Sequence, residues 1–409
     1  MKSVNTFIIS FVATASLFLA GCATTATTQV ADFDKWAKAP VGDLLEQPFA
    51  VHPLDKQQCV EASYIVDSLW IRDVAKRLGN KWGNMTISND SLRLACAVRT
   101  FGLCPPDGRS LYISMHGGGN CPKEVNDEQW YNQIYLYEPV EGIYVAPRAP
   151  WNTSDLWHKK GLDELLEELI QACVVFEGVN PNKVYLLGYS AGGDGVWRMA
   201  PRMADKWAAA SMMAGHPGES SQVNLYNLPF MIWMGEHDHY YDRNILAKEK
   251  GAVMDSLSAA NPGKYIHQTN IIADKGHWMD RVDTLALGWM SQYRRNPYPK
   301  RIVWRQELVT REHFYWLSAP ADEVEQGKSV IASVEGNVIN IEHCDYSSLT
   351  IYLNDRLVNL DEKVTVVYQG KTVAKKRLFR TIGTMHETLG KRNDRSFAFP
   401  AVMHVELRK

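Results

Sequence analysis

One serine in the chain is placed as a nucleophile would be. Ser190 lies at the centre of Gly188-Tyr189-Ser190-Ala191-Gly192, after the apolar run 184–187 and before an amphipathic stretch. A buried strand, a tight turn and a helix present such a hydroxyl at the apex of the turn, and the two glycines let neighbouring backbone approach closely. The same pattern also occurs in ordinary strand-to-helix turns, so the chemistry of Ser190 depends on partners elsewhere in the chain.

A base and an acid for Ser190 occur later in the chain, each after an apolar strand pattern. Asp238 follows the run 230–234, and His277 follows the run 265–273. Histidine can take the hydroxyl proton, and a carboxylate can hold the imidazole in the required tautomer. The order serine, aspartate, histidine and the separations between them leave room for intervening strand and helix units. We therefore predict that Ser190, Asp238 and His277 form a catalytic triad.

Two alternatives remain open around Asp238. Glu236 and Asp242 are the fallback choices for the triad acid. His237 and His239 flank Asp238 as a His-x-His pair that could bind a metal, although the chain offers no companion ligands at a recognisable spacing. The expectation from the sequence is that the site uses neither a metal nor a cofactor.

A glycine-rich loop follows another buried strand pattern at 111–115. It reads His116-Gly117-Gly118-Gly119, and glycine there allows backbone N–H groups to reach the oxygen of a reacting carbonyl. The predicted oxyanion-hole donors are the N–H groups of Gly118 or Gly119 and of Ala191. His116 precedes the serine and is interpreted as structural. A plain flexible turn is an alternative, whereas a phosphate-binding loop would need a Gly-Lys-Ser/Thr that is missing here.

Candidate substrate contacts come from the aromatic residues near these motifs. Tyr189 adjoins the nucleophile, and Trp157 and His158 lie in the long loop after the strand pattern 142–146. Loops that leave the carboxyl ends of parallel strands lie at the active-site edge of a sheet. The chain contains 13 tryptophans and 18 tyrosines, so these residues could equally be packing residues of the loop.

The elements that would position these residues alternate between strand and helix over residues 92–299. Helices are predicted over 125–137, 162–176 and 283–293, with a turn at Pro181-Asn182 before the serine strand. Residues 35–91 have helical periodicity, ending at Gly79-Asn80, and either pack on this domain or cap it. Residues 300–409 consist of short alternating segments with turn residues between them, which predicts a small β-sandwich with one helix near 377–389.

The chain begins with the features of an export signal. Lys2 precedes an apolar core at 7–20, and Leu19-Ala20-Gly21-Cys22 follows. The pattern resembles a bacterial lipobox, which implies a signal peptide over 1–21, a lipid on Cys22 and a flexible tether over 22–34. The expected location is the cell envelope, most simply the outer membrane facing the periplasm, with membrane contact through this lipid.

Composition limits the other classes. The formal charge is −2, without a basic stripe, so nucleic acid is not an expected partner. Six cysteines remain beside Cys22, and their pairing is left open, although an oxidising compartment would permit disulfides. The oligomeric state is also left open.

Residues 92–295 resemble the α/β-hydrolases of the polyhydroxybutyrate-depolymerase, feruloyl-esterase and prolyl-oligopeptidase-like group. The resemblance rests on His116-Gly117-Gly118-Gly119, the motif around Ser190, Gly235-Glu236-His237-Asp238 and Gly276-His277. It implies an α/β-hydrolase fold, a mostly parallel sheet with helices on both faces, and two-step acyl transfer to water through Ser190. The substrate class it suggests is a carboxylic ester, carbohydrate-linked or aryl.

Two further interpretations remain. A serine peptidase of the prolyl-oligopeptidase-like type has the same fold, but the chain lacks the seven-bladed propeller segment of a true oligopeptidase. A non-catalytic hydrolase-fold lipoprotein that binds through residues 300–409 is the second, and it gives no chemical reason for retaining the triad residues and the glycine loop.

Overall fold

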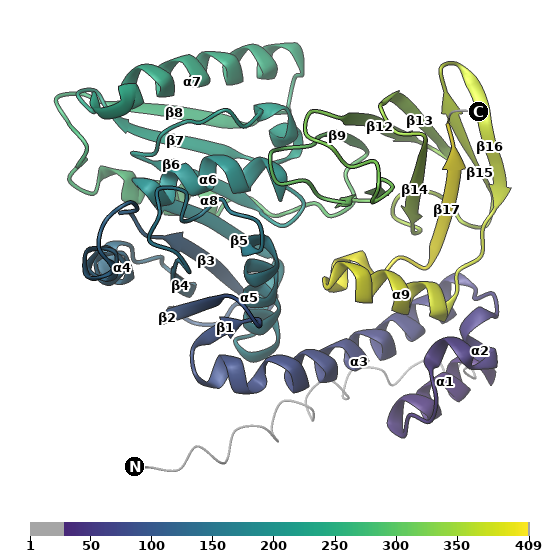
Figure 1. Ribbon diagram of the computed structural model, residues 1–409. Coiled ribbons are helices and arrows are strands. Elements are labelled where there is room, and N and C mark those ends of the chain that lie inside the picture. Colours follow the sequence, from purple (N-terminus) through teal and green to yellow (C-terminus); the bar gives the residue numbers. More distant parts are fainter. Residues whose placement is uncertain (1–27, 408–409) are drawn as a thin grey trace, which may run out of the picture.

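Eight strands form the largest sheet of the computed structural model, which describes residues 28–407 (Figure 1). Their order across the sheet is β1-β2-β4-β3-β5-β6-β7-β8. Pairing is parallel from β4 through β8 and antiparallel only at the β1–β2–β4 edge. This arrangement is the α/β-hydrolase fold predicted from the sequence. The strands are β1 Thr86–Ser88, β2 Arg93–Phe101, β3 Arg109–Met115, β4 Gly142–Arg148, β5 Val179–Tyr189, β6 Ala209–Met213, β7 Phe230–Gly235 and β8 His267–Ile272.

The central strands are apolar on both faces because helices cover both. One face of β3 contributes Leu111, Ile113 and Met115 to the core beneath the helix that follows Ser190, α6 (Ala191–Arg202). The other face contributes Tyr112 to a second core. That second core is rich in tyrosine, and Tyr185 places its hydroxyl on the Tyr293 carbonyl oxygen at 2.9 Å. Burying a tyrosine requires such a partner, so this face combines apolar packing with satisfied hydroxyl groups.

The helices that follow the strands are close to the predicted ones, with two differences. The closing helix predicted over 283–293 is a short 3-10 turn, Val282–Thr284, followed by one short α-helix. The turn predicted at Pro181-Asn182 lies inside β5, where the pairing register with β3 is irregular. The helices are α4 Lys123–Leu136, α5 Leu162–Phe176, α6 Ala191–Arg202, α7 Arg243–Ala260 and α8 Leu285–Met290.

The N-terminal region is helical except at its end. Asp55 begins α3 with a capping box, in which its carboxylate accepts the Gln58 N–H and the Gln58 side chain accepts the Asp55 N–H. The helix continues past the predicted stop at 79–80, because its apolar residues keep packing on α5. The prediction of a purely helical segment was also wrong at 86–88, which form the edge strand β1. The helices are α1 Thr28–Lys38, α2 Pro48–Val51 and α3 Lys56–Gly83.

The C-terminal region forms two further sheets, in agreement with the predicted β-sandwich-like domain. One has the order β10-β11-β14-β17 and the other β16-β15-β13-β12-β9. The single helix lies slightly later than predicted, at α9 Ile382–Arg392. The strands are β9 Arg301–Arg305, β10 His313–Phe314, β11 Leu317–Ser318, β12 Ser329–Glu335, β13 Val338–Cys344, β14 Ser348–Leu353, β15 Lys363–Tyr368, β16 Lys371–Arg377 and β17 Ala401–Glu406.

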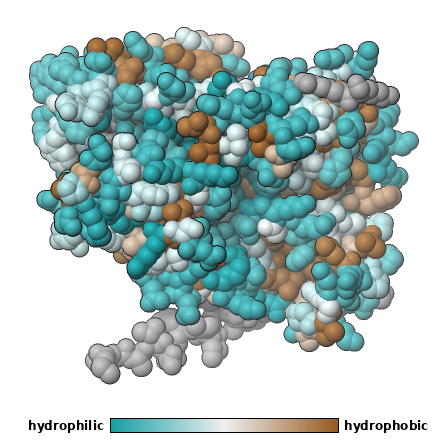
Figure 2. All heavy atoms as spheres, in the orientation of Figure 1, coloured by the Kyte–Doolittle hydropathy of each residue, from teal (hydrophilic) through white to brown (hydrophobic). Residues whose placement is uncertain are grey.

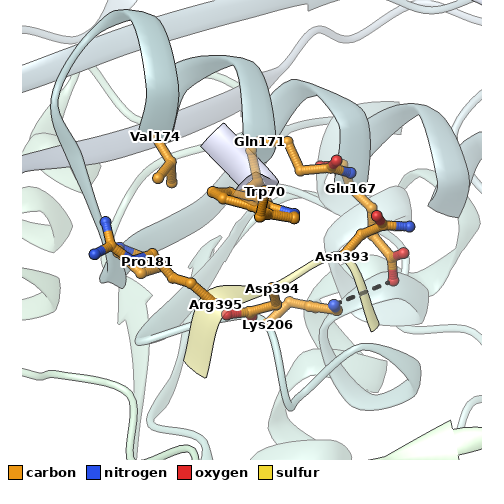
Figure 3. Close-up of a pocket in the computed structure, with 10 residues that line it drawn as sticks. Trp70, Glu167, Gln171, Val174, Pro181, Lys206, Asn393, Asp394 and Arg395 are labelled. Carbon is orange, nitrogen blue, oxygen red and sulfur yellow. Dashed lines mark hydrogen bonds and ion pairs between the residues drawn. The ribbon is translucent and has the colours of Figure 1, made fainter. Parts of the chain in front are cut away.

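Buried ion pairs join the hydrolase sheet to this C-terminal region. Arg392 pairs with Asp205 at 2.7 Å, and Arg295 pairs with Asp394 at 2.6 Å. Figure 3 shows part of this junction, where Trp70 of α3, residues of α5 and residues 393–395 surround a cavity of about 10 Å³. That volume holds at most about one water molecule. The junction is therefore tightly packed.

The junction lies at the end of the sheet opposite Ser190. Asn182, in the first part of β5, receives a hydrogen bond from Arg295, whereas Ser190 follows the last residue of that strand. Eight residues of strand separate the two by roughly 25 Å at about 3.3 Å per residue. In Figure 1 the C-terminal sheets accordingly lie beyond one end of the large sheet and do not cover its other end.

The surface is predominantly polar on the face that Figure 2 shows, with apolar side chains in small separate groups. Within residues 28–407, none of the helices has the length and apolar composition needed to cross a bilayer. The six cysteines in this range are unpaired. The predicted signal peptide, Cys22 and most of the tether lie outside the described residues.

Candidate active site

Ser190 stands in a backbone conformation that few residues other than glycine adopt. It follows β5 directly, with φ 57° and ψ −122°, and its N–H donates to the Met213 carbonyl oxygen at 2.9 Å. Gly192 lies against β3, where a Cβ would stand 2.0 Å from the Met115 carbonyl oxygen. The sequence motif thus has two physical causes: a strained turn that exposes the serine, and a helix start pressed against the neighbouring strand.

The structure brings Ser190, His277 and Asp238 into one hydrogen-bonded line. Ser190 Oγ lies 2.9 Å from His277 Nε2, and His277 Nδ1 lies 2.7 Å from Asp238 Oδ2. The Asp238 side chain is only 1% exposed, whereas that of His277 is 44% exposed. The neutral imidazole can accept the serine proton on Nε2 while Nδ1–H donates to the carboxylate. The arrangement is that of an activated serine nucleophile.

Backbone contacts hold the two loops that carry the base and the acid together. The His237 N–H donates to the Lys275 carbonyl oxygen at 2.7 Å, and the Glu236 N–H donates to the Ile272 carbonyl oxygen at 2.9 Å. At Gly235, a Cβ would lie 2.0 Å from the Gly276 carbonyl oxygen. Glycine at 235 is therefore a condition for the close approach of these loops, which sets the distance between Asp238 and His277.

Tyr189 supports the histidine loop and was predicted as a substrate contact. Its hydroxyl donates to the His277 carbonyl oxygen at 2.6 Å and accepts the Met279 N–H at 3.3 Å. Burial raises the pKa of the phenol, with the carboxylate of Asp283 adding to the effect. The ring also forms part of the cavity wall at Ser190. These two hydrogen bonds indicate that the main role of Tyr189 is to position His277.

His116 fixes the glycine loop from beneath, as its structural interpretation requires. It is fully buried, its Nδ1–H donates to the Gly117 carbonyl oxygen at 2.6 Å, and its Nε2 accepts the Ala149 N–H at 3.1 Å. Burial lowers the pKa of this imidazole to about 4, with Arg148 adding to the effect, so it is neutral near pH 7. Both ring nitrogens are used for structure.

The prediction of Gly119 as an oxyanion donor was wrong. Its N–H donates to Asn126 Oδ1 at 2.8 Å, and Asn126 in turn donates to the carbonyl oxygens of Cys121 and Pro122. Asn126 lies in the first turn of α4 and is fully buried. No local pattern in the sequence points to this residue, because an asparagine in a helix has no recognisable role until its loop neighbours are known.

Backbone N–H groups that could bind an oxyanion come from two segments next to Ser190, the start of α6 and the glycine loop. Ala191 begins α6, so its N–H has no acceptor within that helix. Within residues 28–407, the N–H groups of Gly117 and Gly118 have no hydrogen-bond acceptor, and a Cβ on Gly117 would stand 3.2 Å from Ser190 Cβ. These groups could act as donors to an oxyanion at this position.

A cavity of about 520 Å³ opens beside Ser190 and His277. Its walls are α4 on one side and the loop after His277 on the other, and no residue of 31–90 or of the described range 300–407 contributes to it. A lid role for residues 31–90 therefore has no support in the contacts. The lining residues are Gly117, Gln129, Tyr131, Asn132, Gln133, Tyr135, Leu136, Tyr189, Ser190, His277, Trp278 and Arg281.

Trp157 and His158 are not part of this cavity. Trp157 is fully buried and donates its indole N–H to the His116 carbonyl oxygen at 2.8 Å. Burial, with the nearby guanidinium of Arg198 adding to the effect, lowers the pKa of His158 to about 4. The prediction of both as substrate contacts was wrong, because the loop that carries them folds under the glycine loop. Tyr131 and Tyr135 on one cavity wall and Trp278 on the other are further aromatic lining residues, and no motif in the sequence pointed to them.

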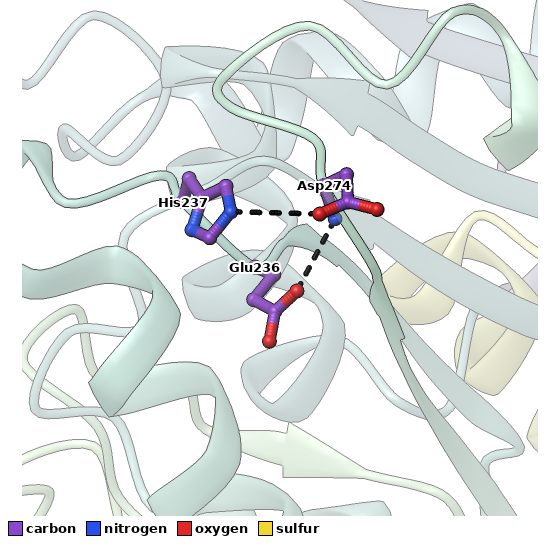
Figure 4. A group of neighbouring side chains, drawn as sticks. All are labelled: Glu236, His237 and Asp274. Atoms are coloured by element: carbon purple, nitrogen blue, oxygen red, sulfur yellow. Dashed lines mark hydrogen bonds and ion pairs between the residues drawn. The ribbon is translucent and has the colours of Figure 1, made fainter.

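A group with ligand atoms suited to a metal lies outside the triad. Glu236, His237 and Asp274 place one ligand atom each within 4.8 Å of the others (Figure 4). His237 and Asp274 are exposed, and such surface groups are common without an ion. The predicted alternative of His237, Asp238 and His239 does not form, because Asp238 contacts His277 and His239 Nδ1 contacts the Asn244 side chain at 3.1 Å.

Comparisons with known proteins give fold-level similarity alone. No protein-family model matches the chain, and no curated protein matches it. Among solved structures, a thermostable esterase is 16% identical over 51% of this chain, with a TM-score of 0.39, and the chain spans 62% of that protein. An acetyl xylan esterase from Aspergillus awamori is 12% identical over 50% of this chain and 97% of its own, with a TM-score of 0.36. A Bacillus cereus carboxylesterase is 14% identical over 49% of this chain and 94% of its own, also with a TM-score of 0.36.

Proposed function

We propose that this protein is a serine hydrolase that cleaves carboxylic esters through an acyl-enzyme on Ser190. The observation that carries the proposal is the continuous hydrogen-bonded line from Ser190 Oγ through His277 to Asp238, with distances of 2.9 Å and 2.7 Å. Such a line can remove the proton from the hydroxyl as it attacks an electrophile, which is the chemistry that acyl transfer requires.

The reaction has two matched steps. His277 Nε2 takes the Ser190 proton while Oγ attacks the ester carbonyl, and the same nitrogen then gives the proton to the departing alcohol. Water next attacks the acyl-enzyme with His277 again as the base, which releases the acid and restores Ser190. Asp238 keeps Nδ1 protonated and stabilises the imidazolium in both steps.

The developing oxyanion would be held by the N–H of Ala191 and by Gly117 or Gly118 of the glycine loop. Loss of one such donor typically raises the barrier by about 3 kcal/mol. His116 and Asn126 hold the loop in place through the contacts described above. They act by positioning the donors and do not touch the reacting atoms.

The substrates we propose are esters with a carbohydrate or aryl group next to the scissile bond. Tyr131, Tyr135 and Trp278 support this choice, since they line the cavity and are at least half exposed, so each ring keeps surface that a substrate ring can contact. The cavity is open and of moderate size, which suits a substituent of one or two rings. Ester cleavage is expected to exceed peptide cleavage.

The proposal is tested by covalent labelling before any substrate is known. A fluorophosphonate probe is added to residues 23–409, and the adduct is located by intact mass and peptide mapping. Labelling is expected on Ser190 in the wild type and is expected to disappear in Ser190→Ala and His277→Ala. Glu236→Gln, which alters a neighbouring carboxylate outside the triad line, serves as the matched control and should label normally.

Two outcomes would count against the proposal. A folded wild type that stays unlabelled would favour the non-catalytic alternative. Labelling together with faster cleavage of a peptide amide than of the matching ester would favour a peptidase.

We also propose that a lipid on Cys22 anchors the protein in the cell envelope, at the outer membrane facing the periplasm. The support is the lipobox-like Leu19-Ala20-Gly21-Cys22 after an apolar core. Cys22→Ser should abolish incorporation of labelled fatty acid and move the chain to the soluble fraction. Equal membrane association of this variant and the wild type would contradict the anchor.

A further inference from the structure

Among the described residues, Arg281 is the one side chain with a permanent charge on the walls of the cavity beside Ser190. The other lining residues are uncharged, apart from the histidine of the triad. We propose that Arg281 binds a carboxylate on the ester substrate while Ser190 attacks the ester carbonyl, so that the preferred substrates are half-esters or other esters with an anionic group. This inference rests on the proposed function and specifies the substrate class of the same site.

Arg281 has no ion-pair partner within residues 28–407, although carboxylates occur near it in the chain. Asp280 pairs with Lys275 at 2.6 Å, Asp283 accepts the Tyr137 hydroxyl, and Glu138 pairs with Arg99 at 2.7 Å. Asp280 and Glu138 thus have cationic partners of their own, whereas the buried Asp283 bonds to a neutral phenol and feels the charge of Arg281 at a distance longer than that of an ion pair. A guanidinium carries five N–H donors, and Arg281 uses one of them on the Leu136 carbonyl oxygen at 2.8 Å. Its remaining donors are free for a ligand.

The backbone fixes the position from which the Arg281 side chain extends. Asp280 and Arg281 have φ values of 52° and 65°, and two consecutive non-glycine residues in the left-handed region are unusual. Met279, just before them, is fully buried, and its N–H donates to the Tyr189 hydroxyl. Strained residues of this kind persist where the surrounding structure holds them, and they concentrate at binding sites.

Contacts from both walls therefore place the guanidinium at the cavity rim. The loop after His277 supplies the residue, and the Leu136 carbonyl of α4 holds its side chain from the opposite wall. A planar guanidinium matches a carboxylate through two parallel hydrogen bonds, which a lysine cannot provide. An ester oriented this way would have its carbonyl at Ser190 and its carboxylate at Arg281.

Matched esters test the proposal in the full soluble chain. The 4-nitrophenyl monoesters of succinic, glutaric and adipic acids carry a free carboxylate at increasing distance, and their methyl esters are neutral counterparts. The measured quantity is the ratio of kcat/KM for each anionic ester to that of its neutral counterpart. The variants are Arg281→Met, which removes the charge, and Arg281→Lys, which keeps it. Arg377→Met removes an equal charge from the exposed strand β16, far from the cavity.

The wild type should prefer one of the anionic esters, and Arg281→Met should lower that ratio about fivefold, as expected for an exposed charge pair worth about 1 kcal/mol. Arg281→Lys should retain part of the preference, and Arg377→Met all of it. The preference should weaken between about 0.01 M and about 1 M salt, because the guanidinium is exposed. An unchanged ratio in Arg281→Met, or an equal fall in Arg377→Met, would overturn the proposal.

A binding experiment separates this inference from the proposed function. The monoanilide of glutaric acid and its methyl ester are titrated calorimetrically into Ser190→Ala. The anion should bind to Ser190→Ala more tightly than its methyl ester does, and this difference should disappear when Arg281→Met is added. That result supports the carboxylate site even if no ester is turned over. Equal affinity for the two compounds would overturn it, whatever the result of the labelling experiment.

Discussion

Two polar clusters of this molecule differ in how completely they are closed. The line from Ser190 through His277 to Asp238 is buried at its acid end, while the His277 side chain is 44% exposed at the other. The pair between Asp205 and Arg392, at the junction with the C-terminal sheets, is at most 3% exposed at either side chain. A site that receives a substrate must leave one end open, whereas charges that only support the fold can be enclosed.

The enclosed cluster illustrates what burial demands of charges. Burial alone would raise the pKa of Glu167, but Lys206 and Arg311 outweigh it and bring the value down to about 2. Arg311 also contacts Asp163 at 3.1 Å, so one C-terminal arginine serves two acids of α5. Asp163, Glu167, Asp205 and Asp394 thus each contact an arginine on the other side of the junction, which specifies how the two regions pack.

The first prediction is that the Ser190 hydroxyl affects turnover without affecting stability. Ser190→Ala and His277→Ala should each lower kcat/KM on the order of 10⁴- to 10⁶-fold, since the nucleophile and its base act as a unit. The melting temperature of Ser190→Ala should stay close to that of the wild type, because the Ser190 hydroxyl is hydrogen-bonded to the half-exposed His277. In contrast, His277→Ala also leaves the buried Asp238 without its partner and should lower the melting temperature. Ester hydrolysis and a thermal melt check this, and a loss smaller than tenfold would contradict it.

The second prediction concerns the enclosed cluster, where a substitution should lower stability and leave turnover unchanged. Asp205→Ala leaves Arg392 buried without its partner, which should lower the free energy of unfolding by about 3–5 kcal/mol. The kcat of the folded fraction should be unchanged. Urea unfolding gives the stability, and Asp34→Ala, which removes an exposed pair with Lys38, should cost less than about 1 kcal/mol. Equal losses in the two variants would refute the contrast.

The third prediction uses pH to test the buried His116. Its folded pKa, about 4, lies below the ordinary value of 6.5, so the unfolded chain binds a proton in this window and the folded chain does not. The contribution of neutral His116 to the free energy of unfolding is fully present above pH 6.5. It is lost as the pH falls toward 4, by at most about 1.4 kcal/mol per pH unit.

Urea unfolding of the wild type and His116→Gln between pH 7.5 and pH 4.5 checks this contribution. The stability of the variant should depend less steeply on pH, and the difference between the two chains cancels the other titrating groups. Parallel curves would show that His116 is not held neutral.

The fourth prediction is the smallest and concerns Asn126, which connects the glycine loop to α4. Asn126→Ala removes the acceptor of the Gly119 N–H and should lower kcat about tenfold with KM nearly unchanged, because the oxyanion donors lose their fixed position. Glu128→Ala, at an exposed position of the same helix, is the matched control. A rise in KM with an unchanged kcat would instead indicate a direct substrate contact.

The sequence contained enough to predict the fold and the three residues that meet at the site. Strands covered on both faces appear as short apolar runs, and the carboxyl ends of parallel strands share one edge, so the residues after three such runs must lie together. Glycine is required at 192 and 235 because the backbone of a neighbouring segment lies where a Cβ would be. These are local consequences of strand and turn chemistry, which a single sequence records.

Only the tertiary structure decided which way each nearby side chain faces and which N–H groups remain free. Trp157 and His158 stand in the predicted loop, yet the loop passes beneath the glycine loop, and Tyr189 holds the histidine loop through its hydroxyl. In the sequence Gly119 is equivalent to Gly118, whereas in the structure the Gly119 N–H donates to Asn126. Side-chain direction and hydrogen-bond pairing depend on residues distant in the chain, so no local pattern could supply them.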